Sequence, residues 1–142
     1  MPVTVTWGDD ARTWMYYTLS EPWLWDDFYA ATTAGHEMRI CADVPAVSIV
    51  VDVQQARKIP ADTLTQVNIM GRRDTLVGDH IQRIVIVGAN AFLRSILAMV
   101  GRVAPRFGTR MVLVDSLTEA ENILEADARQ RAKNAPDAVP TP

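Results

Sequence analysis

Residues that commonly ligate metals are scarce in this 142-residue chain. It has one cysteine, Cys41, and two histidines, His36 and His80. Neither histidine has a ligand-type partner at the spacing that places two side chains on one face of a helix. A single cysteine excludes an internal disulfide and a CxxC motif. The sequence therefore predicts no metal and no cofactor, with both histidines at the surface or partly packed.

Two groups of carboxylates could carry acid–base or phosphate chemistry. The pair Asp26-Asp27 stands in an expected first helical turn, where acids interact favourably with the helix dipole. Asp9-Asp10 and Asp52 superficially match the acidic pair and phospho-acceptor of a receiver domain. However, no helix is expected after Asp10, and Asp115 stands where that family has a lysine. We therefore reject the receiver interpretation and expect no catalysis by the acid pair.

The ends of the expected strands offer another place for chemistry. Open α/β sheets bind ligands outside the carboxyl ends of their strands, where Asp52, Asn90 and Asp115 fall in this chain. An enzyme with an unrecognised site there is one alternative. Gly88-Ala89-Asn90 joins a strand to a helix whose N-terminus could bind an anion, which makes Gly88 and Asn90 a weak anion-site candidate. The motifs GxSxG, GxGxxG and GxxxxGK[ST] are absent.

Charge is unevenly distributed along the chain. Residues 1–56 hold eight acids against two arginines, whereas residues 57–110 hold nine basic residues against three acids. Such regions either neutralise one another across the fold or meet a charged partner. An expected helix over 91–106 carries Arg94, Arg102 and Arg106 on one flank, as a solvated face or as a contact for a membrane surface or an acidic partner. The sequence pI of 5.3 disfavours nucleic-acid binding.

Aromatic residues concentrate near the N-terminus. Eight of the ten lie within residues 7–29, namely Trp7, Trp14, Tyr16, Tyr17, Trp23, Trp25, Phe28 and Tyr29. Two strands and one helix can bury only part of this set, so an exposed remainder would form an interface or line a pocket. This surplus predicts a homodimer, and the alternative is a carrier or sensor of a small apolar ligand or lipid.

The elements that position these residues follow the order ββαβαβαβα. Strands are expected at 3–7, 13–19, 47–53, 84–87 and 111–114. Helices are expected from Ser20-Glu21-Pro22 to about Gly35, from Pro60-Ala61-Asp62 to a fraying end between Gly71 and Gly78, over 91–106, and over about 117–131. Too few residues separate the first two strands for a helix, which favours an antiparallel edge hairpin.

The continuous apolar runs of the later strands indicate a mostly parallel sheet covered by flanking helices. We therefore expect an α/β fold with one domain over residues 1–131 and a disordered tail over 132–142. No apolar run approaches the roughly 18 residues of a membrane span, and no signal peptide is visible. The expectation is a cytoplasmic protein with no transmembrane segment.

This order of elements resembles the STAS domain, the fold of anti-sigma-factor antagonists. The central strand reads Val51-Asp52-Val53 where family members often read Leu-Asp-Leu, and Ile59-Pro60-Ala61-Asp62-Thr63-Leu64 is similar to the family's Ile-Asp-Ser-Ser-Gly-Leu. The stretch from Val112 to Ala120 looks like the last strand and helix of the family, where a Ser-x-x-Glu-Ala pattern is common. The resemblance covers roughly residues 3–131.

The resemblance implies a non-enzymatic regulatory module that binds a protein partner. The family's phosphorylatable serine corresponds to Asp62, so the phosphoserine switch is not expected here. Asp62 either copies a permanently charged state or simply favours a helix N-terminus, and the neighbouring Thr63 could accept a phosphate. The loop 54–63, with Arg57, Lys58, Asp62 and Thr63, is expected to be exposed and to face the partner.

Overall fold

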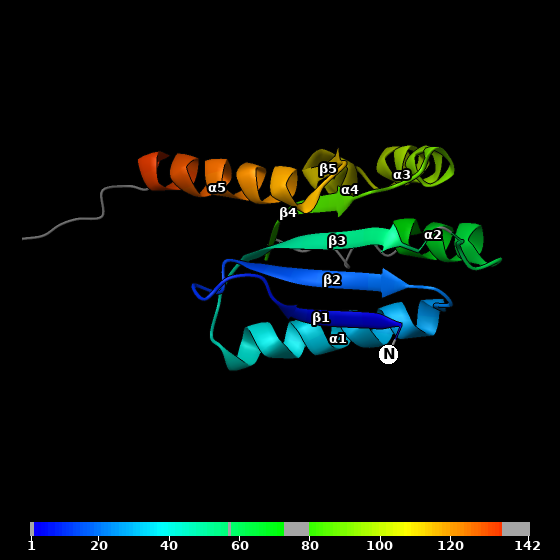
Figure 1. The fold of residues 1–142 in the computed structure, drawn as a ribbon, viewed down its shortest axis with the longest axis horizontal. Coiled ribbons are helices and arrows are strands. Elements are labelled where there is room, and N and C mark those ends of the chain that lie inside the picture. Colours follow the sequence, from blue (N-terminus) through cyan, green and yellow to red (C-terminus); the bar gives the residue numbers. More distant parts are fainter. Residues whose placement is uncertain (1, 57, 73–79, 135–142) are drawn as a thin grey trace, which may run out of the picture.

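The computed structural model describes residues 2–56, 58–72 and 80–134. Five strands and five helices follow one another along this part of the chain in the order ββαβαβααβα (Figure 1). The strands are β1 (Val3–Trp7), β2 (Trp14–Ser20), β3 (Val47–Gln55), β4 (Ile81–Val87) and β5 (Met111–Val114). The helices are α1 (Trp25–Cys41), α2 (Thr63–Arg72), α3 (Ala91–Val103), α4 (Pro105–Arg110) and α5 (Leu117–Asn134).

The sheet has the strand order β1-β2-β3-β4-β5. β1 pairs with β2 antiparallel, with Val5 opposite Tyr17, while the remaining neighbours pair in parallel. This confirms the α/β class, the N-terminal antiparallel edge and the parallel pairing of the three later strands. Parallel neighbours bring the carboxyl ends of β2, β3, β4 and β5 to one edge of the sheet.

The sheet is covered on both faces. Alternate residues of the strands, such as Met15, Val51 and Ile86, join side chains of α1, α3 and α4 in the larger core. On the other face, Val50 and Val85 pack with Leu124 and its neighbours on α5. The alternation places Tyr17 in the first core and Tyr16 beside the second. Adjacent tyrosines therefore have different surroundings.

The first helix begins later and runs further than the sequence predicts. Ser20 does not cap it, because Ser20 still belongs to β2 and pairs with Gln55 of β3. The backbone N–H of Leu24 instead donates to the Asp27 carboxylate at 2.9 Å, and the helix starts at Trp25. Gly35 lies inside α1 rather than at its end. A Cβ at this position would overlap the Tyr17 hydroxyl, so the close packing of α1 on β2 requires glycine here.

Further boundaries also differ from the expected ones. The helix expected over 91–106 ends at Val103, and α4 follows with Pro105 in its first turn, which adds a helix to the predicted order. α5 continues to Asn134, so residues 132–134 of the expected tail are helical. Residues 135–142 and Gly78 lie outside the described residues.

Candidate functional site

The residues expected at the strand ends lie at one edge of the sheet, and each of them has a structural contact. Asp52 accepts hydrogen bonds from the Tyr16 hydroxyl at 2.5 Å and from the backbone N–H of Gln54 at 3.0 Å. Asp115 pairs with Arg94 at 2.9 Å. Burial, together with the bond to Asp52, raises the pKa of Tyr16 to about 12, which keeps its hydroxyl a donor at neutral pH. These contacts hold the edge together.

The weak anion-site candidate uses its donors internally. Gly88 has a φ of 79°, a left-handed conformation that glycine adopts without strain. The Asn90 side chain caps α3 by accepting a hydrogen bond from the backbone N–H of Leu93 at 2.9 Å. That N–H is among those a bound anion would need. Gly88 and Asn90 line a hollow of about 510 Å³ with Gln54.

The loop expected to face a partner is only partly exposed. Lys58 and Asp62 are exposed, as predicted, whereas Arg57 lies outside the described residues. Thr63 is 4% exposed, so the prediction that its side chain faces solvent is wrong. Its hydroxyl donates to the Pro60 carbonyl at 2.6 Å and accepts from the Trp25 indole N–H at 3.0 Å. These two bonds turn Thr63 inward and leave no accessible hydroxyl for phosphorylation.

An apolar surface on α2 and α3 lies next to this loop in the sequence and in the fold. It consists of Leu64 and Ile69 of α2 and Phe92 and Met99 of α3, which are 53%, 39%, 63% and 40% exposed. α2 contacts α3, and both follow strands at the same edge of the sheet (Figure 1). Phe92 and Met99 are two helical turns apart and so share one side of α3, whereas Leu64 and Ile69 lie about 140° apart around α2. We call these four residues the α2–α3 surface.

Phe92 lies outside the buried face of α3. The buried stripe of α3 runs through Ile96 and Val100, with Leu93 and Leu97 packed on the sheet. Phe92 precedes that stripe by one residue, which turns its ring by about 100° toward solvent. A strict reading of the spacing i, i+3, i+4 and i+7 from Leu93 would have identified Phe92 as exposed.

The basic flank expected on one helix is divided between two helices. Arg94 donates to the Ala89 carbonyl at 3.0 Å and pairs with Asp115, so it is engaged within the fold. Arg102 is exposed on α3. Arg106 belongs to α4, because the chain leaves the helical path at Ala104. The predicted alignment of these three arginines along one helix is therefore wrong.

The N-terminal aromatic residues are more buried than their number suggested. Tyr17 and Trp23 are buried, and the other six are half-buried. Trp23, Trp25, Phe28 and Tyr29 form a cluster with ring centroids 5.3 to 6.4 Å apart. The Tyr29 hydroxyl donates to Gln66 at 2.7 Å, which links the cluster to α2. The expected exposed remainder is absent from these eight residues, and the homodimer stays a prediction.

An apolar cavity of about 120 Å³ lies beside this aromatic cluster. The side chains around it come from the sheet and from all four helices α1 to α4, and they include Trp25, Phe28, Ile96 and Phe107. Among its polar lining atoms, the Thr63 hydroxyl and the Trp25 indole N–H bond to each other, while the buried indole N–H of Trp23 has no hydrogen-bond partner in the described part of the chain. We call this space the aromatic cavity. Its lining fits only an apolar occupant.

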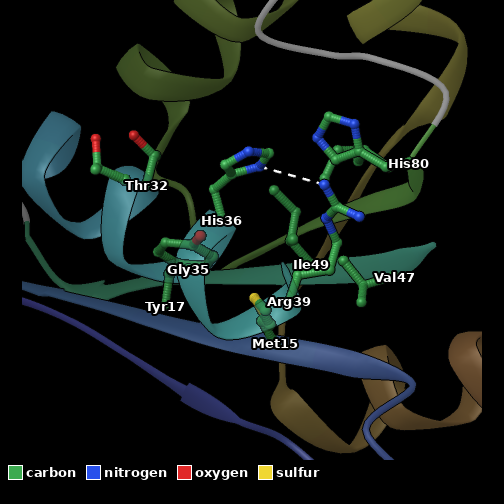
Figure 2. Close-up of a pocket in the computed structure, with 11 residues that line it drawn as sticks. Met15, Tyr17, Thr32, Gly35, His36, Arg39, Val47, Ile49 and His80 are labelled. Carbon is green, nitrogen blue, oxygen red and sulfur yellow. Dashed lines mark hydrogen bonds between the residues drawn. The ribbon is translucent and has the colours of Figure 1, made fainter. Parts of the chain in front are cut away.

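A second and larger pocket lies at the other end of α1, where the structure brings His36 and His80 together (Figure 2). Their ring centroids are 5.7 Å apart, although the histidines are far apart in the sequence. Arg39 lies beside them and directs one terminal guanidinium nitrogen at Nδ1 of His36, at 3.4 Å. The volume of this histidine–arginine pocket is about 320 Å³.

The contacts of Arg39 bear on which ring nitrogen of His36 accepts a hydrogen bond. A guanidinium group has no acceptor, so Nδ1 of His36 accepts and the ring proton lies on Nε2. The other terminal nitrogen donates to the Val44 carbonyl at 3.1 Å, and the buried Nε–H has no hydrogen-bond partner in the described part of the chain. Tyr17 lies below, and burial raises its pKa to about 12. Its hydroxyl is therefore a protonated donor.

Metal binding finds no support in the described ranges. No group of three or more histidine, cysteine, aspartate or glutamate side chains is placed there to hold a metal ion. Cys41 is exposed as a free thiol at the end of α1. None of the helices in residues 2–56, 58–72 and 80–134 has the length and apolar character needed to cross a bilayer.

Comparison of the sequence with protein-family models gave no match, and comparison with curated proteins gave none. The resemblance to the STAS domain therefore rests on the order of the elements and on the three sequence stretches that carry it. The observed sheet has the predicted arrangement. The membership of a family stays a hypothesis.

Proposed function

We propose that this protein is a regulatory interaction module that acts by binding a protein partner through the α2–α3 surface, without catalysis of its own. The observation that carries this proposal is the exposure of Phe92 and Leu64, at 63% and 53%. Large apolar side chains that stay in solvent on neighbouring helices are typical of protein-binding surfaces. Asp62, exposed at the start of α2, would add a charge at the rim of this surface.

Two further features support a binding role. The polar residues at the strand ends are engaged in capping and in contacts between elements, which leaves Asp52, Asn90 and Asp115 committed to the structure. The resemblance to anti-sigma-factor antagonists also implies partner binding at the segment that holds Asp62. A cytoplasmic location and a protein partner other than a second copy of this chain belong to the same proposal.

Affinity capture from the native cell, followed by binding measurements with the purified partner, tests the proposal. The decisive variants are Phe92→Asp and Leu64→Asp, which place a charge in the α2–α3 surface. Ile40→Asp is the matched control, because Ile40 is also an exposed apolar residue, at 57%, but lies near the C-terminal end of α1 and outside the α2–α3 surface. The proposal expects partner binding by the wild type and by Ile40→Asp, and its loss in both surface variants. Equal binding by all variants would contradict it.

The aromatic cavity supports a second candidate function, the carriage of a small apolar ligand. A cavity of about 150 Å³ lined by apolar side chains can stay dry and bind benzene or xenon, and the cavity here has a comparable volume of about 120 Å³. Xenon pressurisation monitored by NMR tests this candidate, which expects shifts confined to residues such as Trp25 and Phe107. Unchanged spectra under xenon would exclude it, and would leave the proposal of partner binding unaffected.

A further inference from the structure

The histidine–arginine pocket combines a positive rim with apolar walls. Among the described residues, its lining carries a guanidinium and two imidazoles but no carboxylate. In the part of the chain that the structure describes, no acid pairs with Arg39. The pocket is therefore electropositive, and a negatively charged group would restore local charge balance there.

Hydrogen-bond donors face the same space. Each terminal nitrogen of Arg39 carries a second N–H beyond those used for Val44 and His36. The Tyr17 hydroxyl makes no hydrogen bond to another described residue, although Tyr17 is only 5% exposed. Because Tyr17 lines the pocket, an acceptor bound there could take the hydrogen bond that this hydroxyl does not make within the fold. Figure 2 shows Tyr17 and His36 on one side of the pocket and Arg39 beside them.

The remainder of the lining restricts the kind of anion. Met15, Val47, Ile49 and Ile81 form apolar walls between the sheet and α1. A hydrated inorganic anion would lose water against these walls, and the walls themselves offer no hydrogen-bond donor in its place. One guanidinium matches one negative charge, which favours a monoanion over a phosphate dianion. The volume of about 320 Å³ falls within the range of small-molecule sites.

We propose that the histidine–arginine pocket binds a small monocarboxylate with an apolar body. The carboxylate accepts hydrogen bonds from Arg39 and Tyr17, next to the two imidazoles, and the apolar body lies against Met15 and Ile49. This site is separate from the α2–α3 surface. α2 contacts the first part of α1 through Trp25 and Tyr29, whereas the pocket lies near the end of α1, at His36 and Arg39. A bound carboxylate would tie α1 to β2 and to His80, just before β4.

Calorimetric titration of the full chain with benzoate tests this site. Benzyl alcohol keeps the apolar body without the charge, and acetate and sulfate supply a charge without that body. We expect benzoate to bind, and we expect each of the three control compounds to bind with an affinity at least about tenfold lower. NMR signals of the His36 and His80 rings should shift with benzoate. Absence of binding at millimolar benzoate, or equal binding of benzyl alcohol or sulfate, would overturn the proposal.

Paired variants locate the binding. Arg39→Gln and Tyr17→Phe should each weaken benzoate binding about tenfold, because each removes a hydrogen bond to a charged group. Arg102→Gln, on exposed α3, and Tyr16→Phe, on the other face of the sheet, should leave it unchanged. Circular dichroism checks folding. If Arg39→Gln fails to fold, Tyr17→Phe decides, and wild-type affinity in that variant would refute the proposed donor set.

Discussion

The two ends of α1 cover the same sheet but enclose different kinds of space. Near its start, Trp25 and Phe28 border the aromatic cavity, where the indole N–H of Trp25 bonds to Thr63 and the buried indole N–H of Trp23 has no partner in the described part of the chain. Near its end, His36 and Arg39 border a pocket in which the Tyr17 hydroxyl and the remaining terminal N–H groups of Arg39 have no acceptor among the described residues. The two spaces therefore differ mainly in the chemistry of their linings: an apolar lining suits packing or an apolar occupant, whereas a guanidinium beside imidazoles suits an anionic ligand.

We call the start of α1, beside the aromatic cavity, the closed end, and the end of α1, beside the histidine–arginine pocket, the open end. The largest effect should come from removing an aromatic ring at the closed end. Trp23→Ala should lower the free energy of unfolding by about 3–5 kcal/mol, since Trp23 is buried within the aromatic cluster. His36→Gln, at the open end, should change it by less than about 0.5 kcal/mol because the side chain is exposed. Urea denaturation measures both. Similar losses in the two variants would break the distinction between the ends.

The fit between α1 and β2 at the open end gives the next effect. Gly35→Ala should destabilise the fold by about 1–3 kcal/mol, because the new Cβ would overlap the Tyr17 hydroxyl. Tyr17→Phe removes that hydroxyl, so the double variant should regain part of the loss. A double-mutant cycle by urea denaturation measures this coupling. Additive effects would mean that the two residues do not interfere.

At the closed end, Thr63→Val preserves the shape of the side chain but removes its hydroxyl. The free energy of unfolding of this variant should be lower by about 1–3 kcal/mol, because the indole N–H of Trp25 and the Pro60 carbonyl both lose a partner. Thr65→Val is the control, since Thr65 is exposed on the same helix. Thermal unfolding compares the two variants. An equal, small change in both would show that the bonds of Thr63 contribute little.

Alkaline pH should destabilise the protein through the two tyrosines whose pKa is raised, Tyr16 and the more deeply buried Tyr17. The pKa of Tyr17 is raised by burial from 10.0 to about 12, so the unfolded chain loses this proton first. Between pH 10 and 12 the folded state binds more protons than the unfolded state, and stability therefore falls as the pH rises. Tyr17→Phe should make the unfolding free energy less dependent on pH in this window. An unchanged slope would contradict the assignment.

The smallest effect on stability is expected at Asp62. Asp62→Ser should change the free energy of unfolding by less than about 0.5 kcal/mol, because the side chain is exposed and serine also favours a helix start. Under the proposed function, the same substitution changes partner affinity. Denaturation and partner titration together separate the two roles. A large loss of stability with unchanged affinity would make Asp62 a structural residue.

Most of the architecture follows from local patterns in the sequence. Alternation in Val3–Trp7 and the apolar runs beginning at Val47 and Ile84 predicted the strands. The short connection between the first two strands predicted their antiparallel pairing, and the continuous apolar runs predicted the parallel pairing of the later strands. Helix boundaries were less predictable. Ser20-Glu21-Pro22 has a favourable capping sequence, yet Ser20 stays in the sheet because its backbone pairs with β3 and with Pro2. Such long-range pairing overrides a local capping preference.

The candidate sites divide in the same way. The sequence by itself determined the fold class, the exposed Asp62 and the set of aromatic residues, because periodicity and composition depend on neighbours along the chain. Only the tertiary structure decided that Thr63 turns inward and that Phe92 faces solvent. It also placed His36 and Arg39 of α1 beside His80, at the start of β4, and above Tyr17 of β2. Packing of α1 on the sheet creates that proximity, and no spacing along the chain encodes it.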